Sequence, residues 1–151
     1  MTPALVPVTV EQARAVVGGD WSVLPATRGW PHADTVDALR PVAESGIAEG
    51  TFLVLLDGVV IGECGWFGPP DAAGEVEIGY GLAAPMRGHG HGAVAVRSLV
   101  AWVAARPGVR RVTARTDQTN AASRRLLERL GFVVDGADGP QVRYALDVTA
   151  T

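Results

Sequence analysis

The chain lacks several features that would restrict what it can do. Its single cysteine, Cys64, excludes an internal disulfide. The first ten residues contain neither a basic segment nor a long apolar run, so we expect no signal peptide and no membrane partner. No basic stripe interrupts a sequence of net charge −3, which argues against nucleic acid as the partner. Together these absences predict a cytoplasmic location.

The sequence has enough apolar residues to form one core. Its 151 residues are the size of one ordinary domain, and 48% of them are hydrophobic. It shows no repeats, low-complexity tracts or linkers, so we expect residues 1–151 to form a single domain. Hydrophobic periodicity and turn signals predict the order β-α-α-β-β-β-α-β-α-β-β, which is an α+β protein with one parallel crossover.

Two local signals place elements in the first half of the chain. Thr9 and Gln12 form a capping-box pattern in front of a helix expected over residues 10–17. Asp57 and Gly58 stand between two β-rich apolar runs, which predicts a two-residue hairpin.

The most informative stretch is Met86–Ala93, which reads M-R-G-H-G-H-G-A. It follows an extended apolar run over 76–82 and precedes an amphipathic segment over 93–105. A strand, a glycine loop and a helix start in this order favour phosphate binding, because the first N–H groups of a helix have no partner within it and the helix dipole adds positive charge. The loop contains no lysine, so main-chain amides would be the donors, with Arg87 as the nearby cation.

Two phosphate-binding patterns fit this loop. Gly88, Gly90 and Ala93 satisfy G-x-G-x-x-A, the dinucleotide fingerprint. That fingerprint normally occupies the first β-α turn of repeating βαβ units, whereas three strands without intervening helices precede it here. Arg87, Gly90 and Gly92 satisfy a second pattern, R-x-x-G-x-G, which the context favours.

With two neighbouring segments, this second pattern resembles the GNAT superfamily of N-acetyltransferases. The strand E-V-E-I-G-Y-G-L (75–82) leads into the loop, and T-D-Q-T-N-A-A-S-R-R-L-L-E-R-L-G-F (116–132) is similar to the N-x-x-S…LGF segment of that superfamily. The most similar branch contains ribosomal-protein N-terminal alanine acetyltransferases. The resemblance implies a mixed, mostly antiparallel central sheet, splayed between the fourth and fifth strands and flanked by about four helices. It also implies acetyl-coenzyme A (acetyl-CoA) as the cosubstrate.

The resemblance implies roles for individual residues. The main chain of Tyr80, Gly81 and Leu82 would pair with the pantetheine arm, and the Leu82 amide would stabilise the developing oxyanion. Asn120 and Ser123 would supply side-chain hydrogen bonds to the cofactor. The residues that would hold the pyrophosphate are Arg87, Gly88, His89, Gly90, His91, Gly92 and Ala93.

Glu75 and Glu77 are the candidate bases, because a substrate amine must lose a proton before it attacks. In a regular strand they share one side, opposite Tyr80 and Leu82, and a bulge would change that phase. Which glutamate faces the site is therefore left open. Many members of the superfamily have a tyrosine acid seven residues after the Asn120 position, where this chain has Leu127.

Other residues admit two interpretations each. Trp30 and Trp66 are candidates for the acceptor pocket, although core packing alone would account for them. Glu63, in an apolar strand, is either a third acidic group in the site or a solvent-facing side chain. His89 and His91 lack a third ligand at a convincing spacing, so we expect no metal site.

These observations predict transfer of an acetyl group from acetyl-CoA to a primary amine, a peptide N-terminus or a small amine, by direct attack in a ternary complex. Leu127 supports the alternative, a domain of the same fold that binds acyl-CoA without turnover. The resemblance also allows a homodimer, for which an exposed edge strand over 142–148 would serve.

Overall fold

The computed structural model describes residues 2–22 and 24–148, so residues 1, 23 and 149–151 of the predicted domain lie outside the described part. The internal contacts divide the chain into two compact units, and each is described by itself. Unit 1 comprises Met1–Gly65 and Tyr80–Val96, and unit 2 comprises Trp66–Gly79 and Arg97–Thr151.

Unit 1 is built on antiparallel strands. β1 (Ala4–Pro7), β2 (Thr51–Leu56) and β3 (Val59–Trp66) pair in that order. Asp57 and Gly58 join β2 to β3 with φ of 54° and 77°, which is the left-handed backbone that a two-residue hairpin needs. The predicted hairpin is therefore confirmed.

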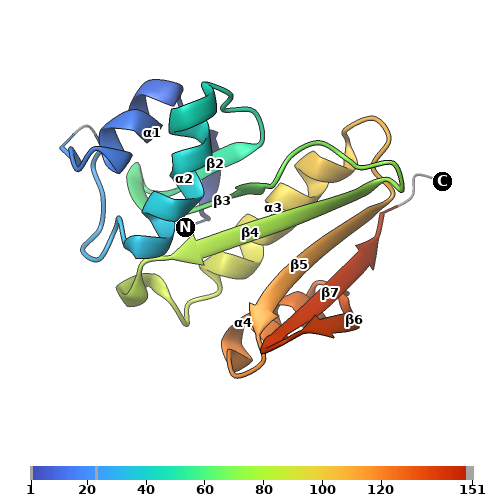
Figure 1. The fold of residues 1–151 in the computed structure, drawn as a ribbon. Helices are drawn as coiled ribbons and strands as arrows, with labels where there is room; N and C mark the ends of the chain where they lie inside the picture. The colour runs from blue at the N-terminus through green and yellow to red at the C-terminus, as the bar shows by residue number, and fades with distance from the viewer. Residues whose placement is uncertain (1, 23, 149–151) are drawn as a thin grey trace. The chain divides into compact units, whose positions relative to one another are not determined.

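Two helices that lie side by side accompany these strands (Figure 1). α1 (Val10–Val17) begins at the predicted capping box, in which Thr9 and Gln12 exchange hydrogen bonds of 3.0 Å. α2 (Ala33–Ser45) follows an irregular segment. Buried apolar side chains of both helices, the strands and the connecting segments form the core of unit 1: Val8, Ala13, Val16, Trp30, Leu39, Val42, Leu53, Val60 and Ala83.

Unit 2 contains the parallel pair that the crossover predicted. The first half of β4 (Glu75–Leu82) pairs with β5 (Arg111–Asp117), and this register ends at Ile78. β4 itself continues to Leu82, beyond the residues that pair with β5. β5 then pairs antiparallel with β7 (Gln141–Asp147), which pairs with β6 (Val133–Asp138).

The residues of β4 are divided between the two units. The hydrogen-bonded strand order is β1-β2-β3-β4-β5-β7-β6. This is the mixed, mostly antiparallel sheet that was expected. The described helices also include α3 (His91–Ala104) and α4 (Ala121–Arg129). None of the helices in the described ranges is both long and apolar enough to cross a membrane.

The prediction that residues 142–148 form an exposed edge strand is wrong. β7 covers most of residues 142–148, but it lies between β5 and β6, and β6 forms the edge. Val133 and Val134 on β6 are 65% and 56% exposed. β6 and β7 form one hairpin, and the order of strands in the sequence does not show which of the two pairs with β5.

Candidate active site

The glycine loop joins β4 to α3 within unit 1. A short turn, η1 (Ala84–Met86), follows β4, and α3 begins at His91 rather than at Ala93 as predicted. Gly88 and Gly90 have φ of +81° and +82°, and no described atom lies within 4 Å of a Cβ built at either. These glycines therefore serve the backbone conformation, and they leave the main chain before α3 open to a ligand.

The end of β4 presents an N–H group that is suited to pairing with a ligand. Ala83 N–H donates to the Ile61 carbonyl of β3 at 2.9 Å. Because successive N–H groups of a strand point to opposite edges, the Leu82 N–H points away from β3. Arg87 Nε donates to the Leu82 carbonyl at 3.2 Å, which ties the glycine loop back to this end of β4.

Two glycines allow β3 and β4 to approach closely here. A Cβ on Gly62 would collide with the Gly81 carbonyl and would lie 2.7 Å from Leu82 Cδ2. A Cβ on Gly81 would collide with Oε2 of Glu63 and would lie 3.3 Å from His32 Cε1. Without a side chain at Gly81, the Glu63 carboxylate reaches the backbone of β4 next to Leu82.

Glu63 is a buried carboxylate, only 4% exposed, so the solvent-facing interpretation is wrong. Its Oε1 accepts hydrogen bonds from Trp30 Nε1 at 3.1 Å and from Thr35 Oγ1 at 2.6 Å. Burial raises the pKa of Glu63 from its usual value near 4.5 to about 7. The two hydrogen bonds oppose this shift, and the nearby charge of Asp34 adds to it.

His32 completes this cluster. Its Nε2 lies 3.8 Å from Oε1 of Glu63. That nitrogen is buried and has no hydrogen-bond partner among the described residues, although 22% of the side chain is exposed. We name the set Trp30, His32, Thr35 and Glu63 the Glu63 cluster.

The two predicted bases lie in unit 2, where each forms an ion pair. Glu75 Oε1 is 2.7 Å from Nη2 of Arg143, and Glu77 Oε2 is 3.4 Å from Nε of Arg115. The strand alternates regularly between these half-buried carboxylates and buried apolar residues, so both glutamates share one face, as predicted. Each therefore already has a partner within its own unit.

The other predicted site residues of unit 2 have structural contacts. Trp66 packs edge-to-face on Trp102, with ring centroids 4.8 Å apart. Asn120 caps α4, because its Oδ1 accepts the Ser123 N–H at 3.1 Å. Leu127, at the position of the usual tyrosine acid, is fully buried.

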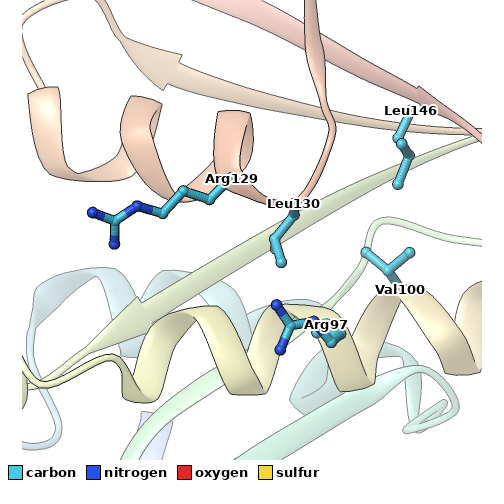
Figure 2. A pocket seen from close by; sticks show the side chains of 5 residues that line it. All are labelled: Arg97, Val100, Arg129, Leu130 and Leu146. Carbon is cyan, nitrogen blue, oxygen red and sulfur yellow. The ribbon is translucent and has the colours of Figure 1, made fainter.

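Unit 2 also contains a small pocket, which Figure 2 shows from close by. Val100, Leu130 and Leu146 point toward one another in it, while the guanidinium group of Arg129 extends away. Arg97 completes the lining. None of the predicted site residues lines this pocket, so it adds nothing to the candidate site.

His89, His91 and Cys64 lie outside the Glu63 cluster, and Cys64 is buried. The rings of His89 and His91 lie 5.9 Å apart, and the described residues contain no group of three or more side chains able to hold a metal ion. Burial, with a smaller contribution from the charge of Glu63, raises the pKa of Cys64 to about 12. The Cys64 thiol therefore stays neutral at physiological pH.

Sequence reasoning placed the glycine loop and singled out Glu63, but it missed His32 and Thr35 as partners of that carboxylate. Trp30, a candidate for the acceptor pocket or for the core, is buried and donates to Glu63. The position of Glu63 inside an apolar strand was the signal for it, whereas no pattern in the sequence pointed to His32 and Thr35. A buried acid in such a strand needs partners, and residues 30–35 supply them.

The element order and the open glycine loop at the start of α3 agree with the class of acetyltransferase that the sequence resembles. Residues 4–133 match the family described as "Acetyltransferase (GNAT) domain", and the chain belongs to this family. A relative from Bacillus subtilis (strain 168), the uncharacterized N-acetyltransferase YjdG, is 32% identical over 114 residues, which cover 70% of this chain and 68% of that protein.

Solved structures share the fold at lower identity. The ribosomal alpha-N-protein acetyltransferase RimL, solved with coenzyme A, has a TM-score of 0.70 at 17% identity and covers 97% of this chain and 94% of its own. The microcin self-immunity acetyltransferase MccE, solved with acetyl-CoA and AMP, has a TM-score of 0.68 at 16% identity and covers 97% and 92%. The family match confirms the resemblance to GNAT acetyltransferases, and the solved structures confirm the predicted fold.

Proposed function

We propose that this chain is an acetyl-CoA-dependent N-acetyltransferase that moves the acetyl group to a primary amine by direct attack in a ternary complex. The observation that carries the proposal is the open glycine loop at the start of α3, next to a strand end whose Leu82 N–H points away from β3. Membership of the GNAT family and the acetyl-CoA or coenzyme A in the related structures support it.

The loop residues suit the phosphates of coenzyme A. The N–H groups at the start of α3 would bind the pyrophosphate, with Arg87 as the nearest cation. The backbone of residues 80–82 would bind the pantetheine arm as an added strand would. Asn120 and Ser123 stay proposed ligands, and the Asn120 amide nitrogen is not used in the cap.

The chemistry requires a neutral amine at the thioester. At pH 7 a lysine-type amine is almost wholly protonated, and an α-amine, with a pKa of about 7.7–8.0, much less so. The amine nitrogen bonds to the carbonyl carbon, the carbon–sulfur bond breaks, and the Leu82 N–H stabilises the negative charge on the carbonyl oxygen. A carboxylate has to take a proton, and Glu75, Glu77 and Glu63 are the candidates.

A second candidate function is acyl-CoA binding without turnover. The observation that favours it is Leu127, a fully buried leucine at the position where the resemblance implies a tyrosine acid in many members of the superfamily. The thiol of coenzyme A resembles a cysteine thiol of pKa about 8.5, so it can also leave as thiolate without that acid.

Calorimetric titration and thiol release together test these functions. Acetyl-CoA, desacetyl coenzyme A and NAD are titrated in parallel, and thiol release is then followed with an alanyl peptide, spermidine, an aminoglycoside and phenylethylamine. Binding of the coenzyme A species with amine-dependent release supports the transferase, and binding without release supports the sensor. Absence of acetyl-CoA binding overturns both. The chain contains no lysine, so release without added amine cannot come from acetylation of its own lysines.

A further inference from the structure

We propose that Glu63 is the general base of the reaction, that its Oε2 takes the proton from the amine, and that His32 passes this proton to solvent. The proposal rests on the acetyl transfer proposed above. It deepens that function, because it assigns a catalytic role to a residue outside the strand that carries Glu75 and Glu77.

The hydrogen bonds of the Glu63 cluster determine which oxygen can take a proton. Trp30 Nε1 can only donate, and its bond goes to Oε1. The Thr35 hydroxyl oxygen accepts the backbone N–H of His32 at 3.2 Å, and the single proton of this hydroxyl is donated to Oε1. Two donors already point at Oε1, and an added proton therefore belongs on Oε2.

Oε2 faces the place where the reacting group is expected. It lies against Gly81 so closely that a Cβ there would collide with it. Gly81 directly precedes Leu82, whose N–H is the proposed oxyanion donor. Oε2 of Glu63 on β3 thus lies against the residue that directly precedes the oxyanion donor on β4, and all three residues belong to unit 1.

The surroundings of Glu63 give it the proton affinity that a base at neutral pH needs. Burial raises its pKa to about 7, and the charge of Asp34 near the start of α2 acts in the same direction. His32 is the other titratable group of that helix start beside the carboxylate, and Cys64 is its neighbour on β3. A general base works best when its pKa lies near the operating pH.

His32 offers a route for the proton out of the buried site. Its Nε2 is 3.8 Å from Oε1, and like Oε2 it borders the space that a Cβ on Gly81 would fill, at 3.5 Å from that position. The nitrogen lacks a partner among the described residues, while part of the His32 side chain reaches solvent. A buried nitrogen without a hydrogen bond lowers stability, so a site that keeps one is expected to supply a partner for it during function. We therefore treat His32 as a positioning and relay residue.

The proposed step is balanced in protons and electrons. The ammonium group gives one proton to Oε2 of Glu63, and the neutral nitrogen bonds to the acetyl carbon. The carbon–sulfur bond breaks and its electron pair leaves with sulfur. The second proton of the nitrogen goes to that thiolate, which gives the amide and the free thiol, and Glu63 returns its proton to solvent through His32.

The test compares thiol release by the wild type, Glu63→Gln, Glu75→Gln, Glu77→Gln and His32→Asn between pH 5.5 and 9, with whichever amine the wild type accepts best. Glutamine has the shape of glutamate and keeps an oxygen for Trp30 and Thr35. Glu44→Gln, an exposed substitution on α2, is the matched control. A second acceptor, O-methylhydroxylamine, is already neutral at pH 7 and does not need a base to become nucleophilic.

We expect Glu63→Gln to lower kcat/KM at least about 100-fold at pH 7.5, with acetyl-CoA affinity unchanged. The wild-type profile should rise through an apparent pKa of about 7, and Glu63→Gln should lose this limb. With O-methylhydroxylamine the defect should be small, whereas a misfolded variant would lose both reactions. His32→Asn should lower kcat, and a higher buffer concentration should restore part of the loss.

Other outcomes would distinguish a failure of the proposed role of Glu63 from a failure of the proposed acetyltransferase function. Wild-type activity with an unchanged Glu63→Gln profile overturns the role of Glu63 alone, and a selective loss in Glu75→Gln or Glu77→Gln places the base on β4. An equal defect of Glu63→Gln with both acceptors makes its role structural and overturns the proposal. Absence of turnover by the wild type with every amine overturns the transferase, and the role of Glu63 with it. An unaffected His32→Asn overturns the relay.

Discussion

The stability of this chain should depend on pH through Glu63, independently of any activity. The carboxyl group has a pKa of about 7 in the folded chain against about 4.5 when it is not buried. Below pH 4.5 it is protonated in both states, and its contribution to stability is fully present. As the pH rises toward 7 the unfolded chain ionises first, so stability falls, and above pH 7 the loss is complete.

The size of this effect follows from the two pKa values. A difference of about 2.5 units, at about 1.36 kcal/mol for each, amounts to about 3 kcal/mol. Glu63→Gln removes the ionisable group and keeps the hydrogen bonds to Oε1. The variant should therefore match the wild type near pH 4.5 and exceed it by about 3 kcal/mol at pH 8.5.

Urea unfolding, followed by tryptophan fluorescence at pH 4.5, 6, 7 and 8.5, measures this difference, with Glu44→Gln as the control that should show no trend. A difference between wild type and Glu63→Gln that does not change with pH would refute the reasoning. So would a variant less stable than the wild type at pH 8.5, since the carboxylate would then be better solvated or paired than its burial indicates. A buried carboxylic acid that lowers stability at neutral pH is typical of a functional residue, because functional sites are often retained at a cost in stability.

Three further predictions concern the rest of the site. Gly90→Ala should lower the free energy of unfolding by about 1 kcal/mol and weaken acetyl-CoA binding in calorimetry, whereas Gly58→Ala, at a φ of +77° instead of +82°, should cost similar stability and leave binding intact. Leu127→Tyr should not restore a tyrosine acid, because the position is fully buried, and should lower stability in urea by about 1–3 kcal/mol through overpacking. Glu75→Gln breaks a partly exposed ion pair with Arg143, so its free energy of unfolding in urea should change by less than about 1 kcal/mol, and a larger loss would show that this pair stabilises the fold more than exposed pairs usually do.

Much of the fold follows from local rules. The capping box at Thr9, the hairpin at Asp57-Gly58 and the cap of α4 at Asn120 each depend on residues within three positions of one another. The C-terminus of α4 is equally local, since Gly131 has a φ of 94° and the Phe132 N–H donates to the Leu127 carbonyl at 3.0 Å. Short-range chemistry of this kind can be read without knowing what the chain packs against.

The sequence was less informative where the partners are distant. It indicated Glu75 and Glu77 as bases because both lie on the strand that the resemblance places beside the thioester, but it could not show that Arg143 and Arg115 pair with them. The sequence also could not predict whether β6 or β7 lies next to β5, because the two strands of a hairpin can show the same alternation of apolar and polar residues.

By itself, the sequence determined the family, the element order and the glycine loop, because each is a pattern of neighbouring residues that the backbone translates directly into conformation. Only the tertiary structure placed a carboxylate on β3 between the start of α2 and the end of β4. The proton affinity of Glu63 comes from that burial, and it is opposed by hydrogen bonds from residues that lie 28 and 33 positions away in sequence. No local pattern encodes such an environment, because burial is a property of the assembled fold.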